Sequence, residues 1–451
     1  MGSVVVGLGK TGASCLRYLA KRGIQVSATD TRSKPPGLAE LGGLEKTLDI
    51  RLGGFDLSLL DGASQLLMSP GVSLEEPIAS QARARGIEVL GDIELFARAV
   101  RAPVIGVTGT NGKSTVTSLV ARMAAAAGRR VLAGGNLGVP ALDLLELEVP
   151  DLYVLELSSY QLETTFSLEL KAAVVLNVTA DHMDRYASMA DYARAKARIF
   201  AKAATWVLNA DDPLSAAMAG PAAARPAAGR AVPRIVTFST RGADADFTLE
   251  RRGGERLLAR RGEALLDISR LKITGLHNAA NALAALALGE AAGLPLPPML
   301  EALESFPGLP HRSAWVADVA GVRYIDDSKG TNVGATMAAV SGLAGPLVMI
   351  AGGEGKGQDF TPLAAAFHGK VRHVVLIGKD AAVIEAALRG IAPTERAATL
   401  EAAVRAAARA ARPGDTVLLS PACASFDMFR DYGHRGDVFA AAVRDLAGGP
   451  A

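Results

Sequence analysis

A glycine-rich run with an adjacent lysine and two hydroxyl side chains is the strongest chemical signal in this sequence. The run GVTGTNGKST spans Gly106 to Thr115 and lies between an apolar stretch, 104–107, and an alanine-rich stretch typical of a helix. A strand that turns on glycines into a helix directs backbone N–H groups and the positive helix end at one point, which suits a polyphosphate. Lys113 would reach the outer phosphates, and Ser114 or Thr115 would hold Mg²⁺. The sequence therefore predicts a nucleoside-triphosphate site.

The loop departs from the strict phosphate-binding pattern at one position. That pattern asks for a glycine five residues before Gly112, and Val107 stands there instead. We therefore interpret the run as a shortened phosphate loop. The alternative is an ordinary glycine turn between a strand and a helix, which would leave the Gly-Lys-Ser-Thr sequence without a purpose.

A carboxylate and a histidine follow two further apolar stretches and could complete a metal–nucleotide site. Glu156 ends the apolar run 152–156, and His182 stands between Asp181 and Asp184. Because ligands of doubly wound sheets bind at the carboxyl ends of the strands, we expect Glu156 to face the triphosphate and help hold Mg²⁺. His182 is a candidate metal ligand or a residue that supports one. The alternatives are that Glu156 only caps the next helix and that His182 is structural.

A second glycine-rich turn lies near the N-terminus. Gly7-Leu-Gly-Lys-Thr-Gly12 has the G-x-G-x-x-G spacing between an apolar run and a helical stretch, and Asp30 ends the next predicted strand. This context is typical of a dinucleotide site and by itself would favour a nicotinamide-dependent oxidoreductase. Because a separate phosphate loop follows, a nucleotide-linked substrate in the first domain is the better hypothesis. A tight packing turn without a ligand is the alternative.

Polar turns follow three of the strands predicted in the last third of the chain. They span 326–332, 352–356 and 420–427, and Lys329 and Lys356 lie in the first two. Three polar turns that each follow a strand indicate one shared opening of a binding site, in which the two lysines would hold an anion. Each turn alone could be only a capping turn, but together they predict a second substrate site.

Strand-like apolar runs alternate with helical stretches through most of the chain, which predicts parallel sheets covered by helices on both faces. We expect an α/β protein with three domains: a Rossmann-like domain at 1–98, a central nucleotide-binding domain at 99–305 and a Rossmann-like domain at 306–451. The central domain should combine a mainly parallel, P-loop-type sheet with a small antiparallel sheet. Strands are predicted at 3–6, 24–28, 104–107, 131–133, 152–156, 172–178, 206–209, 257–260, 264–268, 315–319, 322–325, 347–351, 374–377 and 416–419.

Composition limits the classes of partner. The 451 residues include 48 Lys and Arg against 46 Asp and Glu, a net charge of +2, so no basic footprint for nucleic acid is present. Cys15 and Cys423 are far apart, which argues against a disulfide framework and favours a reducing compartment. We expect a cytoplasmic protein that binds small molecules, with no apolar run of membrane-spanning length and a flexible Ala/Pro-rich loop at 222–233.

The chain resembles the Mur ligases of peptidoglycan synthesis along essentially its whole length. The segments similar to the wider family are 108–115, 181–185 and 275–278. The segments similar to the members that add D-glutamate are 327–332, 420–425 and Arg435-Gly436. The resemblance implies an ATP-dependent amide ligase that joins D-glutamate to UDP-N-acetylmuramoyl-L-alanine through an acyl phosphate, using two Mg²⁺ ions and acting as a monomer.

The same resemblance implies roles for individual residues. It places ATP at Gly109, Thr110, Asn111, Gly112, Lys113, Ser114, Thr115, Asn278, Asn281, Arg312, Asp327 and Lys329. It places the UDP substrate at Thr11, Asp30, Thr31, Arg32, Asn136 and Ser158, and D-glutamate at Thr331, Lys356, Ser425 and Tyr432. It makes Lys113, Glu156, His182 and Lys196 catalytic, and it makes Ser114, Glu156, His182 and the carbamate of Lys196 metal ligands. By its position in the helical stretch 189–200 alone, Lys196 would be interpreted as a solvated surface lysine.

Overall fold

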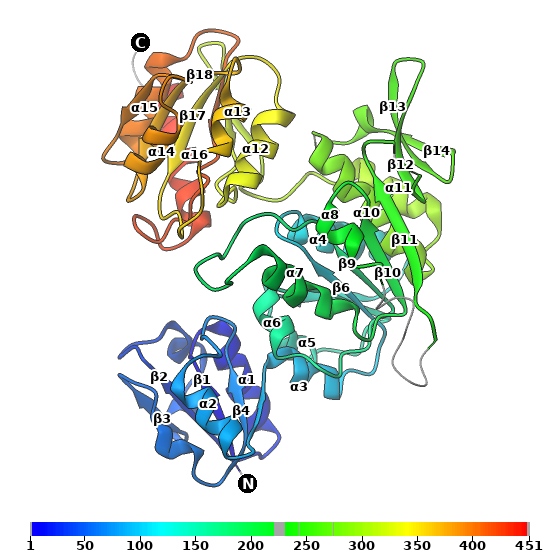
Figure 1. Ribbon diagram of the computed structural model, residues 1–451, viewed down its shortest axis with the longest axis vertical. Coiled ribbons are helices and arrows are strands. Elements are labelled where there is room, and N and C mark those ends of the chain that lie inside the picture. The colour runs from blue at the N-terminus through cyan, green and yellow to red at the C-terminus, as the bar shows by residue number, and fades with distance from the viewer. Residues whose placement is uncertain (1, 221–230, 243, 274, 449–451) are drawn as a thin grey trace. The chain divides into compact units, whose positions relative to one another are not determined.

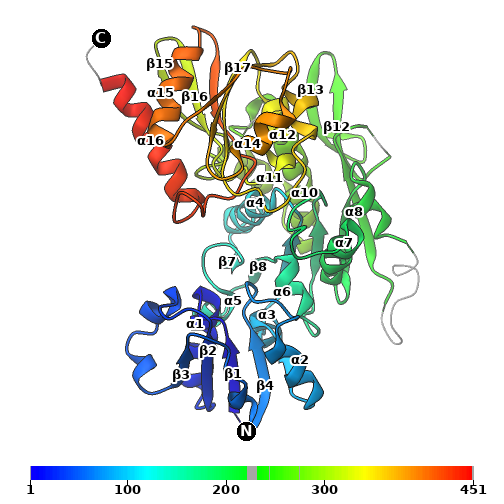
Figure 2. The same ribbon diagram turned by 60° about the vertical axis from the view of Figure 1, so that its left-hand side comes forward.

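The computed structural model describes residues 2–220, 231–242, 244–273 and 275–448 (Figures 1 and 2). The chain divides into two compact units: one holds residues 1–178, 190–266 and 281–303, and the other holds 179–189, 267–280 and 304–451. Three sheets are present, and each is built from strands of one predicted domain. The three-domain α/β class is confirmed, while the boundaries at 98 and 305 stay predictions. Most of the predicted loop at 222–233 lies outside the described residues.

The N-terminal sheet has five parallel strands in the order β3-β2-β1-β4-β5. Its strands are β1 Gly2–Val6, β2 Val26–Asp30, β3 Asp49–Leu52, β4 Ala63–Met68 and β5 Glu88–Leu90. Its helices are α1 Lys10–Lys21, α2 Pro77–Ala84 and α3 Asp92–Ala99. The second strand begins two residues later than predicted, because Ile24 still donates its N–H to the carbonyl of Leu19 and so completes the end of α1.

The glycine turn after β1 is shorter than predicted. Helix α1 begins at Lys10, so Gly12 lies in its first turn rather than in the loop. A Cβ atom at Gly12 would overlap the carbonyl oxygen of Gly7. The glycine therefore allows the helix to pack closely against the end of β1, which is the packing role that the third glycine of this motif has in dinucleotide folds.

The central sheet has nine strands in the order β14-β13-β12-β11-β10-β9-β6-β8-β7. Its strands are β6 Val104–Thr108, β7 Val131–Gly135, β8 Leu152–Glu156, β9 Ala172–Val175, β10 Thr205–Asn209, β11 Arg234–Ser239, β12 Phe247–Arg252, β13 Glu255–Arg260 and β14 Glu263–Asp267. Strands β6 to β11 pair in parallel and β12 pairs antiparallel with β13. The predicted antiparallel part is therefore present, as an extension of the same sheet.

The helices assigned to the predicted central domain begin with α4, which follows the phosphate loop. They are α4 Lys113–Ala126, α5 Ala141–Leu144, α6 Ser159–Glu163, α7 Met189–Ala197, α8 Pro213–Ala217, α10 Leu276–Ala292 and α11 Leu296–Ser305. Single 3-10 turns occur at Pro36–Glu40, Leu44–Lys46, Leu57–Leu60, Arg198–Phe200 and Ile268–Arg270. Strand β9 ends at Val175 rather than at 178, because Asn177 leaves the sheet and bonds to the phosphate loop.

The C-terminal sheet has six strands in the order β15-β16-β20-β17-β18-β19. Its strands are β15 Ala314–Val319, β16 Val322–Asp326, β17 Leu347–Gly352, β18 Val371–Ile377, β19 Thr394–Arg396 and β20 Thr416–Leu419. Its helices are α12 Val333–Gly342, α13 Pro362–Phe367, α14 Ala381–Ala387, α15 Leu400–Ala410 and α16 Tyr432–Gly448. Only β15 runs antiparallel to its neighbour.

Two separate apolar cores cover the two faces of the C-terminal sheet. One core packs α12, α13 and α14 on one face, and the other packs α15 and α16 on the opposite face (Figures 1 and 2). Strands that are buried on both faces need continuous apolar sequences, which β17 has along its length and β18 has from Val374 to Ile377. The polar residues of this domain are thereby left to the turns that follow the strands.

We predict that Gly12→Ala lowers the free energy of unfolding by about 1–3 kcal/mol, because a methyl group must displace backbone atoms in a packed turn. Gly9→Ala is the matched control: Gly9 has φ −85° and no atom lies within 4 Å of its Cβ position, so its effect should stay within about 0.5 kcal/mol. Denaturant unfolding of both variants checks this. Equal stability of the two variants would contradict the packing role of Gly12.

Candidate active site

The phosphate loop connects β6 to α4 through two glycines in conformations that L-residues rarely adopt. Gly109 has φ +152° and Gly112, which caps α4, has φ +86°. A Cβ at Gly112 would overlap the side-chain oxygen of Asn281, and one at Gly109 would lie 2.9 Å from Cβ of Leu176. Asn281, one of the predicted ATP residues, therefore lies against the loop, and glycine is required at both turns.

Asn177 holds the loop in this shape. Its backbone carbonyl accepts the N–H of Thr110 at 2.9 Å, and its side-chain oxygen accepts the N–H of Asn111 at 2.8 Å. The side-chain amide of Asn177 donates back to the carbonyl of Asn111 at 3.1 Å. Asn177, which follows β9, thus fixes the loop before any ligand binds. The remaining N–H groups of the loop can therefore face a phosphate without a loss of loop entropy on binding.

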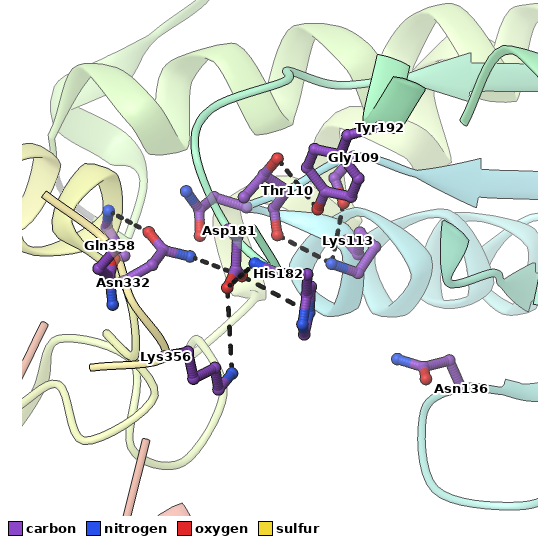
Figure 3. Close-up of polar contacts among 12 residues, drawn as sticks. Gly109, Thr110, Lys113, Asn136, Asp181, His182, Tyr192, Asn332, Lys356 and Gln358 are labelled. Atoms are coloured by element: carbon purple, nitrogen blue, oxygen red, sulfur yellow. Dashed lines mark hydrogen bonds and ion pairs between the residues drawn. The ribbon is translucent and has the colours of Figure 1, made fainter. Parts of the chain in front are cut away.

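Two lysines converge on one carbonyl group of the loop, and Figure 3 shows the contacts of Lys113. Nζ of Lys113 donates to the carbonyls of Gly109 at 2.9 Å and Thr110 at 2.8 Å, and Nζ of Lys196 donates to the carbonyl of Gly109 at 2.9 Å. Lys196 is only 2% exposed and lies 4.3 Å from the ring centre of Tyr192. The interpretation of Lys196 as a solvated surface lysine is therefore wrong, because helix α7 turns this side chain inward.

Glu156 lies one strand away from the loop, since it pairs with Val107 in the register of β6 and β8. It is buried, and its Oε1 accepts the side-chain amide of Asn136 at 2.7 Å. Its Oε2 has no hydrogen-bond partner among the residues that the structure describes. A buried carboxylate oxygen without a donor is costly unless a cation binds it. The expectation that Glu156 only caps the next helix is also not met, because Ser158 makes the cap of α6.

The donor set suits magnesium bound to a nucleotide. Within the described ranges no group of three or more His, Cys, Asp or Glu side chains is arranged to hold a metal ion. Mg²⁺ usually takes one or two carboxylates and fills its remaining positions with phosphate oxygens and water. The buried Glu156, together with the buried hydroxyl of Ser114 at the start of α4, matches that pattern better than a dedicated protein cage.

A cavity of about 590 Å³ opens at the carboxyl end of the N-terminal sheet. Of the residues predicted to contact the UDP substrate, all but Ser158 line it. The lining residues that sequence reasoning missed include Ser69, Pro70, Gly71, Val72 and Ser73 after β4, with Gly135, Gly138, Pro140 and Gln161 of the central segment. The first N–H groups of α1 also point to this edge of the sheet, and a helix start suits a diphosphate.

Asp30 supports this cavity in a different way from the acidic residue of a dinucleotide site. Its Oδ2 accepts the N–H of Leu8 at 2.6 Å, and both of its oxygens accept the guanidinium of Arg32. Burial alone would raise the pKa of Asp30, but the hydrogen bonds from Arg32 and Leu8 outweigh it and lower the pKa. The carboxylate is committed to the glycine turn and to Arg32, so it does not offer the ribose contact that a nicotinamide site requires.

In the second unit, three polar turns follow the adjacent strands β16, β20 and β17. The N–H of Ala422 donates to the carbonyl of Gly330 at 2.8 Å, and Glu354 and Ala424 exchange backbone hydrogen bonds. The structure therefore brings the three predicted turns together at one edge. Thr331, Lys356 and Ser425 belong to these turns, while the role of these residues and Tyr432 in binding an amino acid stays a prediction.

Asp327 of the first turn is engaged within its own domain. Asp327 accepts the hydroxyl of Ser420 at 2.7 Å and the N–H of Ser313 at 3.0 Å. Burial raises the pKa of Asp327 to about 7, although the bond from Ser420 acts in the opposite direction. Nearby, Nζ of Lys329 lies 3.9 Å from the ring centre of Tyr432, so the aromatic face holds a cation.

Asp181 links its segment to two residues of the C-terminal domain within the second unit (Figure 3). Its Oδ2 accepts the side-chain amide of Asn332 at 3.2 Å, and its Oδ1 lies 3.9 Å from Nζ of Lys356. His182 follows in a left-handed conformation with φ +58°, its ring Nε2 3.8 Å from Oδ2 of Asp181. The predicted roles of His182 in metal binding, and of Arg312 and Asn278 in ATP binding, stay predictions.

Arg435 joins two of the three polar turns. It is fully buried and donates to the hydroxyl and carbonyl of Ser328 at 2.9 and 2.8 Å, and to the carbonyls of Cys423 and Ala424 at 3.1 and 3.3 Å. Burial lowers the pKa of Arg435 to about 10, which still leaves the guanidinium charged at neutral pH. The fork of donors thus fixes the spacing between the turns at 328 and 424.

The family profiles match the chain in three consecutive parts. A Mur ligase MurD-like N-terminal domain matches residues 2–91, a Mur ligase middle domain matches 107–289, and a Mur ligase glutamate ligase domain matches 311–423. Residues 107–115 of the phosphate loop fall in the middle part, and most residues that line the cavity fall in the N-terminal part. The chain belongs to the Mur ligase family.

Relatives of near-equal length carry one particular name. A protein from Nitrosococcus oceani named UDP-N-acetylmuramoylalanine--D-glutamate ligase is 54% identical to this chain, over 98% of this chain and 96% of its own length. One of the same name from Pseudomonas aeruginosa is 51% identical, over 98% of both chains.

Solved structures of related ligases share the fold. MurF from Acinetobacter baumannii superposes with a TM-score of 0.63 at 17% identity, covering 99% of this chain and 90% of its own. UDP-N-acetylmuramate-alanine ligase MurC from Thermotoga maritima gives 0.61 at 19% identity, covering 99% of both chains. At this level of identity the likeness concerns the three-domain architecture. No helix in the described part of the chain is both long and apolar enough to cross a membrane.

We predict that Arg435→Met destabilises the C-terminal domain by about 2–4 kcal/mol, because buried carbonyl groups lose their donors. Arg430→Met, at an exposed arginine in the turn before α16, is the control and should change stability by no more than about 0.5 kcal/mol. Calorimetric melting of both variants measures this. If Arg435→Met melted with the wild-type protein, the proposed linkage of the two turns would be wrong.

Proposed function

We propose that this chain is an ATP-dependent amide ligase that adds D-glutamate to UDP-N-acetylmuramoyl-L-alanine in peptidoglycan precursor synthesis. The observation that carries the proposal is the preformed phosphate loop with the buried Glu156 carboxylate on the neighbouring strand. The choice of D-glutamate is supported by the relatives of that name, which match over nearly the full chain. We also propose that the enzyme acts as a monomer in the cytoplasm, where ATP is available and its two buried thiols stay reduced.

The phosphate loop would bind ATP, with Asn281 on the adenine side and Gly109 to Thr115 around the phosphates. Lys113 would leave its two loop carbonyls and contact the outer phosphates, where its charge offsets the charge that develops during transfer. Glu156 and Ser114 would hold Mg²⁺, together with His182 and the carbamate of Lys196. Bound Mg²⁺ supplies charge neutralisation to the phosphates and polarises the phosphoryl group that is transferred.

The chemistry requires activation of a carboxylate. Because its charge is shared by two oxygens, a carboxylate is a poor electrophile. One oxygen of the L-alanine carboxylate attacks the γ-phosphorus and ADP leaves, which produces an acyl phosphate. The neutral amine of D-glutamate then attacks the acyl carbon, loses a proton and expels inorganic phosphate with the electrons of the C–O bond. In this scheme Asn136 and Ser158 would position the acceptor end.

The joined polar turns of the second unit would bind D-glutamate. Lys356 is the cation for a carboxylate, and in this structure its Nζ lies 3.9 Å from Asp181. Thr331 and Ser425 would add hydroxyl groups to this site. Tyr432, at the start of α16, would border it. A carboxylate that replaced Asp181 at Lys356 would make a charge-assisted contact of the same kind.

Phosphate release tests the assignment. We expect purified enzyme with ATP, Mg²⁺ and UDP-N-acetylmuramoyl-L-alanine to release phosphate when D-glutamate is added, and to respond little to L-glutamate, L-alanine, a diamino acid or a dipeptide. Lys113→Met should lower kcat by about 100-fold or more. D-glutamate that gave no more phosphate than the reaction without an acceptor would overturn the proposal, and a response to another amino acid would reassign it to a different Mur ligase.

We further propose that Lys196 carries a carbamate. Its amine is buried beside the loop, and burial of an amine generally favours the uncharged form that reacts with CO₂. The nitrogen attacks the carbon of CO₂ and loses a proton, which gives an anionic N-carboxylate. That product would place a second carboxylate near the phosphate loop, on the same edge of the sheet as Glu156.

We predict that Lys196→Ala lowers kcat by about 100-fold or more and that formate or acetate restores part of the activity, since a small carboxylate can take the place of the carbamate. Lys171→Ala, at an exposed lysine, should keep wild-type activity with or without these acids. Intact-protein mass spectrometry of active enzyme should show one added CO₂. An unmodified amine in active enzyme, with no rescue of Lys196→Ala, would exclude the carbamate.

A further inference from the structure

A buried carboxylate outside the proposed catalytic set lies at the junction of the first and second predicted domains. Asp92 is the first residue of α3 and is 2% exposed. Its Oδ2 accepts the side-chain amide of Gln161 at 3.1 Å, and its Oδ1 has no hydrogen-bond partner within the described part of the chain. Burial raises the pKa of Asp92 to about 6, against the bond from Gln161. An acid in this environment costs folding free energy, which is typical of a position kept for a functional reason.

Gln161 connects this acid to the proposed substrate cavity. It lines the cavity and also forms the capping box of α6, in which its Oε1 accepts the N–H of Ser158 at 3.1 Å. The backbone N–H of Ser158 can only donate, so the Gln161 atom that faces it must be the oxygen. The carboxylate of Asp92 accepts, so the Gln161 atom that faces it must be the nitrogen, Nε2. The two contacts together determine which end of the amide is oxygen and which is nitrogen. The side chain of Gln161 therefore has one orientation at the cavity wall instead of two.

The support for this contact is rigid. The N–H of Gly91 donates to the carbonyl of Thr164 at the end of α6, and a Cβ at Gly91 would overlap the side chain of Thr164. One turn further along α3, the carboxylate of Glu94 accepts the N–H groups of Phe166 at 2.7 Å and Ser167 at 2.9 Å. Helix α3 thus contacts α6 at Gln161 through Asp92, and the end of α6 and the residues after it through Gly91 and Glu94.

We propose that Asp92 is a positioning residue for the nucleotide-sugar substrate. It holds one hydrogen of the Gln161 amide and so directs the second hydrogen toward an oxygen of the sugar–peptide part of the ligand. This inference rests on the proposed function, because it assumes that the cavity binds UDP-N-acetylmuramoyl-L-alanine. ATP binds at the phosphate loop, so a loss of this contact should weaken one ligand selectively.

Three variants separate positioning from stability. Asp92→Leu removes the acceptor and keeps a side chain branched at the same carbon, Asp92→Asn keeps an acceptor oxygen, and Glu94→Gln weakens the same helix contact away from the cavity. We expect Asp92→Leu to raise the Kd for UDP-N-acetylmuramoyl-L-alanine by about fivefold to tenfold and to leave the Kd for a non-hydrolysable ATP analogue within about twofold. Asp92→Asn and Glu94→Gln should leave both Kd values within about twofold, and Glu94→Gln should lower the melting temperature. Isothermal calorimetry and thermal melting provide these values.

A double variant tests the route through Gln161. In Gln161→Met the contact is already lost, so adding Asp92→Leu should weaken nucleotide-sugar binding no further. Additive losses, an unchanged affinity in Asp92→Leu, or equal losses for both ligands would each overturn the positioning role. If Asp92→Leu shows no thermal transition, Asp92→Ala removes the same acceptor with a smaller side chain. If the wild-type protein failed to bind the nucleotide sugar, the proposed function itself would be wrong. The other outcomes leave the proposed function intact.

Discussion

Parallel pairing of strands is the constraint on which the sites of this protein depend. When neighbouring strands run in the same direction, all their carboxyl ends meet at one edge, and the turns that leave that edge must be neighbours in space. In the central sheet this places the end of β6, with its phosphate loop, beside Glu156 at the end of β8. In the C-terminal sheet it places the turns after β16, β20 and β17 side by side. Residues far apart in sequence are thereby brought to the same edge of a sheet.

Buried charges then give these edges their chemistry. Lys113 and Lys196 share the carbonyl of Gly109, Glu156 keeps one oxygen without a donor in the described part of the chain, and Arg435 donates four hydrogen bonds to two turns. Each of these groups is expensive to bury and is stabilised by backbone groups or by a small number of polar side chains. Burial of these groups lowers the stability of the fold but fixes their geometry. A fixed geometry is what positioning for phosphoryl transfer requires.

Much of this could be predicted from the sequence, because glycine turns and apolar runs are local signals. The phosphate loop, the strand that ends at Glu156 and the three polar turns all lie where their sequences indicate. Short or polar strands such as β3, β5 and β19 have no apolar run and gave no signal. The burial of Lys196 could not be foreseen either, since it depends on which face of α7 packs against the loop. The cavity wall at Gln161 and its support from Asp92 depend on the packing of α3 against α6, a tertiary contact with no sequence signature.

The resting contacts of Lys113 have a consequence for discrimination among anions. Its ammonium group is already satisfied by two carbonyl oxygens of the loop, so any incoming anion must replace those hydrogen bonds before it gains from the charge. A single weak anion such as chloride offers too little in return, whereas a triphosphate reaches the helix start, the loop N–H groups and the ammonium at once. The cost of breaking these hydrogen bonds therefore favours highly charged, multidentate ligands at Lys113 and disfavours common cellular salts in the loop.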